Sequence, residues 1–162
     1  MSLSHAVLAE PRREAPSQAT SLRDRLMQTR RLSLRLAGPL SDEDQVVQAM
    51  DDASPTKWHL AHTTWFFEAF VLPRFSPGYR LFDEAFEYCF NSYYEAVGPR
   101  HPRPKRGLLT RPSAQAVRDY RAHVDAGLER LLETGLPAEA EALIELGINH
   151  EQQHQELLLT DI

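Results

Sequence analysis

The histidine pair near the end of the sequence is the clearest candidate for chemistry. Residues 149–156 read NHEQQHQE, which places His150 and His154 four positions apart. On a helix, side chains at this spacing differ by about 40° in direction, so both imidazoles can bind one metal ion. Leu143 and Gly147 fall on the same stripe, so we expect the pair to face inward. Burying two imidazoles is unfavourable unless a metal ion or hydrogen-bonding neighbours satisfy them, and both alternatives stay open for an isolated pair.

A second group of histidines lies on the helix predicted to begin at Pro55. Trp58, His62 and Trp65 share one stripe of that helix, so His62 is expected between two tryptophans on the core-facing side. His59, about 60° off the stripe, is the competing ligand. Three histidines from two packed helices would leave positions on a metal ion open for external ligands, as a catalytic site requires.

The segment from His150 to His154 also matches HExxH, the signature of zincin proteases, in which Glu151 would be the general base. A zincin needs a further metal ligand downstream and a sheet edge for its peptide substrate. Only eight residues follow His154, and the sequence shows no strand-like alternation. We therefore interpret Glu151 as a residue of the helix surface or one that supports the ligands.

A basic loop is the candidate for substrate binding. Residues 100–106 read RHPRPKR, with Arg100, Arg103 and Arg106 spaced three apart. A guanidinium binds a carboxylate through two parallel hydrogen bonds, so this loop could anchor an acidic substrate. A solvated turn is the alternative. The preceding segment 91–94, NSYY, is expected either to line the same opening or to pack in the core.

The elements that position these residues are predicted to be helices. Apolar residues recur at helical spacing in four long segments, over about residues 22–37, 55–72, 114–134 and 137–162. Ser54 before Pro55 and Ser113 are expected N-caps, and Pro73 is expected to end the second helix. Five arginines, at positions 23, 25, 30, 31 and 35, are expected to cover the outer face of the first helix.

The remaining segments predict shorter structure. Ser41 is expected to cap a short helix that runs to about Met50. The span from Pro73 to Pro112 holds six prolines and reads mostly as loop, with a short helical piece around residues 83–96. Residues 1–20 show no periodicity and read as a flexible lead-in before a domain over 21–162. The fold class is therefore all-α: a four-helix bundle with a long proline-rich middle loop.

Composition narrows the classes of function. The 162 residues are 42% hydrophobic and 25% charged, as in an ordinary globular domain. A net charge of −5 argues against a general nucleic-acid binder, and no apolar run reaches the roughly 18 residues that would span a membrane. A single cysteine, Cys89, and the absence of a signal-peptide pattern predict a cytoplasmic location. Composition leaves a homo-oligomer open.

Three segments together resemble a known family. They are SPTKWHLAHTTWFFE at 54–68, FNSYYEAVG at 90–98 with the basic loop after it, and NHEQQHQE at 149–156. In this order they resemble the N-terminal DinB-like domain of the sulfoxide synthases of ergothioneine biosynthesis. The resemblance covers about residues 20–162 and implies a DinB-like four-helix bundle.

The resemblance implies an activity and assigns residues to it. Enzymes of this family use Fe(2+) and oxygen to join the sulfur of cysteine or γ-glutamylcysteine to C2 of the imidazole of hercynine, giving a sulfoxide. Their three iron-binding histidines match His62, His150 and His154, which leaves His59 out. Their substrate-binding Arg-x-x-Arg pair matches either Arg100 with Arg103 or Arg103 with Arg106, so Arg103, which is common to both, is the preferred residue. No catalytic residue is assigned.

The resemblance covers only one of the two domains that the family's enzymes have. Family members continue into a formylglycine-generating-enzyme-like domain that supplies most of the hercynine pocket, whereas this sequence stops at Ile162. We therefore expect a fragment of an oxidoreductase that binds iron and does not turn over alone. The alternatives are a stand-alone DinB-like metal-dependent thiol S-transferase and a non-catalytic helical interaction module. Selenium–carbon coupling enzymes, which look similar in this domain, also remain open.

Overall fold

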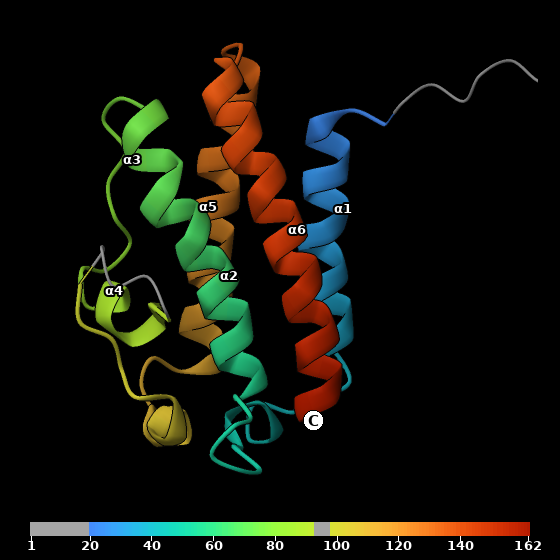
Figure 1. The fold of residues 1–162 in the computed structure, drawn as a ribbon, viewed down its shortest axis with the longest axis vertical. Coiled ribbons are helices and arrows are strands. Elements are labelled where there is room, and N and C mark those ends of the chain that lie inside the picture. The colour runs from blue at the N-terminus through green and yellow to red at the C-terminus, as the bar shows by residue number, and fades with distance from the viewer. Residues whose placement is uncertain (1–19, 93–97) are drawn as a thin grey trace, which may run out of the picture.

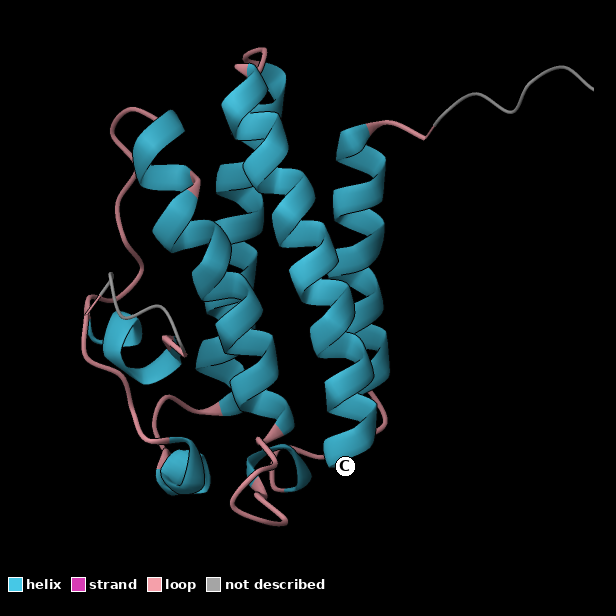
Figure 2. Cartoon of the chain, in the orientation of Figure 1, coloured by secondary structure: helices cyan, strands magenta, loops and turns pink. Residues whose placement is uncertain are grey.

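In the computed structural model, the chain is described over residues 20–92 and 98–162, and this part contains helices and no strand (Figure 2). The all-α prediction is thereby confirmed. The long helices are α1 (Leu22–Ala37), α2 (Thr56–Phe70), α5 (Ala114–Glu133) and α6 (Ala138–Asp161). The predicted lead-in, except for Thr20, and the tyrosines at 93 and 94 lie outside the described residues.

Helix α2 is the centre of the fold. It packs against both α5 and α6, and α6 packs in turn against α1, so that α6 lies between α1 and α2 (Figure 1). Every residue from Thr56 to Glu68 is buried. This helix contributes Trp65, Phe66 and Phe67 to the core, and its buried polar side chains need partners inside the protein. The histidines on this helix are therefore inside the protein.

Helix α6 approaches α2 unusually closely at Gly147. A Cβ atom at this position would lie 2.4 Å from Cε1 of Phe67 and 3.0 Å from Cε1 of Phe66. No side chain larger than hydrogen fits between the two helices without moving those rings. Since His150 begins the next turn of α6, the glycine lets this helix bring its histidines up to α2.

Of the caps predicted for the long helices α2 and α5, one is confirmed and one is wrong. Ser113 Oγ accepts a hydrogen bond from the Ala116 backbone N–H at 3.1 Å, as a cap of α5 should. Ser54, in contrast, does not cap α2, whose N-cap is Pro55. The hydroxyl of Ser54 instead accepts a hydrogen bond from Arg106 Nη1 at 2.8 Å. A long-range partner has taken the oxygen that the local pattern assigned to the helix end.

The short helix predicted from Ser41 to Met50 is wrong beyond its first turn. Only a 3-10 turn, η1 (Asp44–Val46), forms, and the backbone at Val47 is extended. The side chain of Gln48 explains the break: its amide donates to the carbonyl oxygen of Arg103 at 2.8 Å and accepts from the Gly107 backbone N–H at 2.7 Å. These bonds tie the segment to the basic loop.

The middle segment contains more helix than its prolines predict. Helix α2 ends at Phe70, before the predicted Pro73, and Pro73 itself lies in the first turn of α3 (Leu72–Phe75). The helical piece expected around 83–96 is α4 (Ala85–Phe90), and the basic loop holds a second 3-10 turn, η2 (Arg103–Leu108). Helix α4 packs against α2, and the turn η2 lies near the lower end of α2 in Figure 1.

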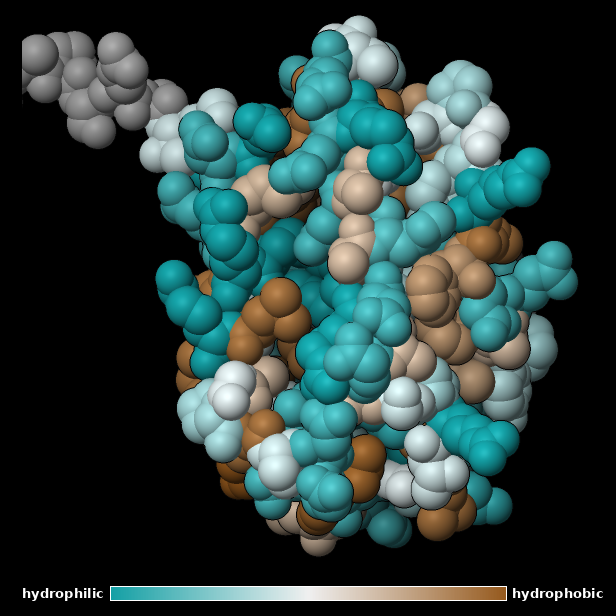
Figure 3. Space-filling model, turned by 180° about the vertical axis from the view of Figure 1, so that it is seen from behind, coloured by the Kyte–Doolittle hydropathy of each residue, from teal (hydrophilic) through white to brown (hydrophobic). Residues whose placement is uncertain are grey.

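The surface is of mixed polarity. The face opposite to that in Figure 1 is largely hydrophilic, with apolar residues in small separate groups (Figure 3). Within residues 20–92 and 98–162, no helix combines the length and the apolar character that a membrane crossing requires.

Candidate metal centre

Three histidines from α2 and α6 converge on one point. Each of His62, His150 and His154 offers a ring nitrogen, and these three atoms lie within 4.8 Å of one another. In the described part of the chain, this is the group of histidine, cysteine and acidic side chains that could hold a metal ion. His62 and the α6 pair are the residues that the sequence predicted.

His62 forms the rigid, buried side of the site. Its ring is stacked between Trp58 and Trp65, with centroids at 4.6 and 5.6 Å and interplanar angles of 14° and 16°. Its Nδ1–H donates to the carbonyl oxygen of Phe90 at 2.6 Å. Because the proton is on Nδ1, the lone pair of the neutral ring is on Nε2, which is the nitrogen that faces His150.

The spacing of the ring nitrogens is that of metal ligands. Nε2 of His62 lies 3.1 Å from Nε2 of His150. Two nitrogens bound to one ion at about 2.0–2.1 Å are themselves roughly 3.0–3.4 Å apart. Nδ1 of His150 is buried and has no hydrogen-bond partner among the described residues. This nitrogen pair, with an orphaned polar atom beside it, fits a site built for an ion.

The chemistry of the three imidazole donors limits which metal ions the site fits. Imidazole suits iron, zinc, copper and nickel, whereas magnesium and calcium prefer oxygen ligands. Three protein ligands leave further positions on the ion for substrate or water. The set of three histidines therefore fits a divalent transition metal with open coordination positions.

His59, the competing ligand of the sequence analysis, lies beside the group and outside it. Its Nδ1 is 2.9 Å from Nδ1 of His154, and its Nε2 is 3.0 Å from Oδ2 of Asp161. Both ring nitrogens of His59 are therefore occupied by hydrogen bonds. In the structure, His59 is a hydrogen-bond partner of the candidate ligand His154 and is not itself a candidate ligand.

The α6 histidines lie at the edge of the core, not in its middle. The buried stripe of α6 runs through Ile144, Ile148 and Glu151, while His150 and His154 are half-buried. The stripe of α6 that is buried is therefore rotated by part of a turn from the stripe that the sequence predicted to face inward. With His62 only 1% exposed, the site has a closed side on α2 and a more open side on α6.

The histidines are held in the neutral form that binds metals. Burial lowers the pKa of His62 well below its ordinary value, and the neighbouring histidines lower it further. Burial also lowers the pKa of His150 to about 4 and that of His154 to about 2. At neutral pH all three rings therefore present a lone pair without having to lose a proton.

These shifts predict that the metal-free protein becomes less stable in mild acid. An ordinary histidine gains its proton near pH 6.5, whereas folded His150 gains it only near pH 4. Between these values the unfolded chain binds more protons, so the free energy of unfolding falls as the pH falls, by up to about 1.4 kcal/mol per pH unit for each such histidine. Urea unfolding with chelator between pH 7 and 4 measures the slope. The variant His150→Gln should give a shallower slope, and an unchanged slope would contradict the assignment.

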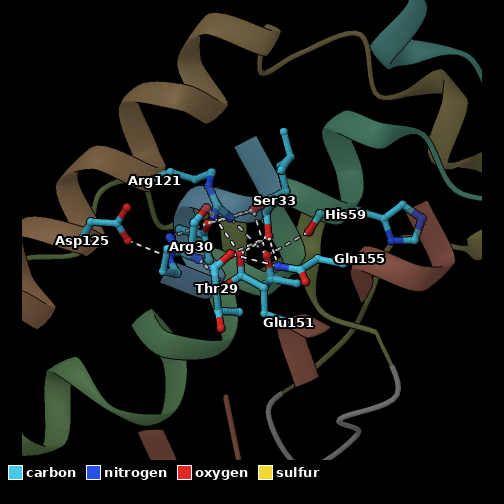
Figure 4. A network of polar contacts seen from close by, with 11 residues as sticks. Thr29, Arg30, Ser33, His59, Arg121, Asp125, Glu151 and Gln155 are labelled. Carbon is cyan, nitrogen blue, oxygen red and sulfur yellow. Dashed lines mark hydrogen bonds and ion pairs between the residues drawn. The ribbon is translucent and has the colours of Figure 1, made fainter. Parts of the chain in front are cut away.

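Glu151, one position after the first α6 histidine, belongs to a buried ionic network (Figure 4). Its carboxylate accepts from Arg30 Nη1 at 2.9 Å, from Arg121 Nη2 at 2.8 Å and from Ser33 Oγ at 2.6 Å. The Arg30, Arg121 and Glu151 side chains are each 1% exposed. The prediction that Arg30 covers an outer helix face is therefore wrong, as is the placement of Glu151 on the helix surface.

The network fixes the charge on Glu151. Burial alone would raise the pKa of this carboxyl, but Arg30 and Arg121 outweigh burial and lower the pKa to about 2. Asp125 adds a second acidic partner, which accepts from Arg30 Nε at 2.6 Å. Because both oxygens of Glu151 are engaged by these donors, the carboxylate is not available as a zincin-type general base. The carboxylate instead links α6 to α1 and α5 through Arg30 and Arg121.

The three arginines of the basic loop have different surroundings. Arg100 donates to the carbonyl oxygen of Ser92 at 2.7 Å, and Arg103 donates to the carbonyl oxygen of Asp52. Arg106 is the buried one, with 5% exposure. Arg106 packs against the ring system of the histidine site.

Arg106 extends the ring stack on His62. Its guanidinium carbon lies 3.4 Å from the centroid of Trp58, the same indole that stacks on His62. The guanidinium also donates to Ser92 Oγ at 3.3 Å, in addition to Ser54. A cation over an indole face is attracted by the ring quadrupole. The positive charge is thus separated from His62 by one ring, and it adds to the causes that lower the pKa of His62 and His154.

The fold and the site together define a helical domain with a group of three histidines suited to a divalent transition metal. The family model of the DinB superfamily matches residues 25–158. The chain therefore belongs to the DinB superfamily. A comparison with curated proteins finds no match.

Proposed function

We propose that the chain binds a divalent metal ion through His62, His150 and His154, and that iron(II) is the ion of its active form. The observation that carries the proposal is the meeting of three neutral imidazoles from α2 and α6, with ring nitrogens within 4.8 Å of one another, in a DinB-superfamily chain. Soft thiolate and imidazole groups of substrates can enter the positions that three histidines leave open.

We further propose that this site is the iron-binding half of an oxygen-dependent sulfoxide synthase. The support is the resemblance of three sequence segments to that family, two of which carry the site histidines, in a helical chain of the DinB superfamily. Iron held by His62, His150 and His154 would supply the oxygen activation that this coupling requires. The contribution of the chain is to hold both substrates at one place, which an otherwise bimolecular coupling lacks.

The basic loop is the proposed anchor of the thiol substrate. Cysteine and γ-glutamylcysteine both carry carboxylates, and Arg100, Arg103 and Arg106 are the candidate partners. Arg106 is the best placed of the three, because it stacks on Trp58 within one ring of His62. Its buried position favours the pair Arg103 and Arg106 over the pair Arg100 and Arg103.

Metal analysis of anaerobically purified protein tests the proposal. We expect about one iron per chain, and oxygen consumption with cysteine plus hercynine only when a formylglycine-generating-enzyme-like domain is supplied. Zinc in place of iron, with thiol transfer to an added electrophile, would instead identify a DinB-like thiol S-transferase. A chain that takes up no metal under any of these conditions would overturn the proposal.

One observation favours the interaction module as a second candidate. Large apolar side chains are exposed around η1, η2 and the end of α6, with Val47 at 60%, Met50 at 65%, Leu108 at 72% and Ile162 at 62% exposure. Exposed apolar groups of this kind mark interaction surfaces. A homo-oligomer in light scattering that Met50→Lys dissociates would support this role, which is compatible with metal binding.

A further inference from the structure

We propose that His59 and Asp161 are positioning residues for His154: they form a hydrogen-bonded relay that fixes its tautomer and directs its Nε2 toward the metal position. The inference rests on the proposed function, because it assigns these two residues to the same three-histidine site. It is carried by the direction of three consecutive hydrogen bonds.

The relay begins at Asp161, near the end of α6. Its Oδ2 accepts from the Ser54 backbone N–H at 2.8 Å and lies 3.0 Å from Nε2 of His59. The Ser54 amide can only donate, so this oxygen is an acceptor, and an ionised carboxylate has no proton to give. Nε2 of His59 must therefore be the donor.

The tautomer of His59 in turn determines the tautomer of His154. A neutral imidazole with its proton on Nε2 has only a lone pair on Nδ1. Nδ1 of His59 lies 2.9 Å from Nδ1 of His154, so the proton of that contact must be on His154. With Nδ1 protonated, His154 keeps its lone pair on Nε2, which is the nitrogen left for an ion.

The arrangement is enclosed, as a relay of fixed direction requires. His59 is 3% exposed, and the side chain of Asp161 is 15% exposed. The ring of His59 is further held edge-on to Trp58, with centroids 5.8 Å apart. Water therefore has little access to compete for these contacts.

Two of the three ligand rings are in this way set by the protein itself. Phe90 fixes His62 through its carbonyl oxygen, and the His59–Asp161 pair fixes His154 through a side chain. Partners of this kind orient a metal-binding imidazole, and their loss typically weakens metal affinity about 10- to 100-fold. His59 is thus assigned a role that its position three residues before His62 does not reveal.

Tautomers measured by NMR on the metal-free protein test the relay directly. Long-range ¹H–¹⁵N spectra distinguish Nδ1–H from Nε2–H rings. We expect His154 to be the Nδ1–H tautomer in the wild type and in His59→Asn, whose amide oxygen can replace Nδ1 of His59. In His59→Leu the acceptor is gone, and His154 should become a mixture of tautomers. A wild-type His154 protonated at Nε2 would overturn the inference.

Metal affinity supplies the second measurement, with Co²⁺ as a spectroscopic probe. We expect binding about 10- to 100-fold weaker in His59→Leu and within about threefold of wild type in His59→Asn. His123→Leu, which removes a histidine whose Nε2 contacts the Arg80 carbonyl oxygen, is the matched control and should bind like wild type. Equal affinity of wild type and His59→Leu would contradict the relay. A wild type that binds no metal would defeat the proposed function, while the tautomer result would still decide the relay.

Discussion

Replacing Glu151 with glutamine is expected to lower the free energy of unfolding by about 3–5 kcal/mol. The carboxylate lies between Arg30 and Arg121, at 2.9 and 2.8 Å, and all three side chains are almost fully buried. Glutamine keeps the shape and loses the charge, so it leaves two buried guanidinium groups with Asp125 as their remaining acidic partner. An uncompensated buried charge is far less favourable than the loss of an exposed pair.

Urea unfolding at pH 7 measures this effect, and Glu156→Gln is the matched control. Glu156 is on the same helix, five residues later, and its side chain is exposed. We expect the control to lie within about 0.5 kcal/mol of the wild type. A loss of less than about 1 kcal/mol in Glu151→Gln would show that the network contributes little, and would reopen a chemical role for this residue.

Replacing His62 with alanine is expected to weaken metal binding by on the order of 100-fold or more. The loss of a residue that only orients a ligand typically weakens affinity 10- to 100-fold, so removal of the ligand itself should reach at least the upper end of that range. His62 is also the ring with the least freedom, because it is stacked between two indoles and bonded to the Phe90 carbonyl oxygen.

Competition of the protein with a chelator of known affinity measures the effect on Co²⁺ or Zn²⁺ binding. His123→Ala is the control, since this histidine packs on Tyr79 and Phe82, away from the site. It should leave the affinity unchanged. If His62→Ala retained wild-type affinity while His59→Ala lost it, the ligand set would be wrong, and His59 would replace His62.

The long helices were predictable because their signals are local. The 3.6-residue period of apolar positions located α1, α2, α5 and α6. The interleaving of His62 with Trp58 and Trp65 correctly predicted a histidine stacked between two tryptophans. Helical spacing brought out His62, His150 and His154 but kept His59 as a competing ligand, and it was the family resemblance that selected the set of three.

The errors came where a distant partner overrides the local signal. Arg30 looked like a surface residue of an amphipathic helix, but it crosses to Asp125 and Glu151 from sequence separations of 95 and 121. Ser54 looked like a helix cap until Arg106 took its hydroxyl. No period or cap rule contains these pairings, because they form only when the helices pack.

The stack around His62 has a spectroscopic consequence. The sequence contains two tryptophans, Trp58 and Trp65, and both lie against the His62 ring. The intrinsic indole fluorescence of the chain therefore originates entirely from two rings that lie against one of the proposed metal ligands. Tryptophan fluorescence can therefore report metal binding without an added label. A quenching ion bound at the three histidines would lower the total emission, whereas an ion bound elsewhere on the surface would leave the emission unchanged.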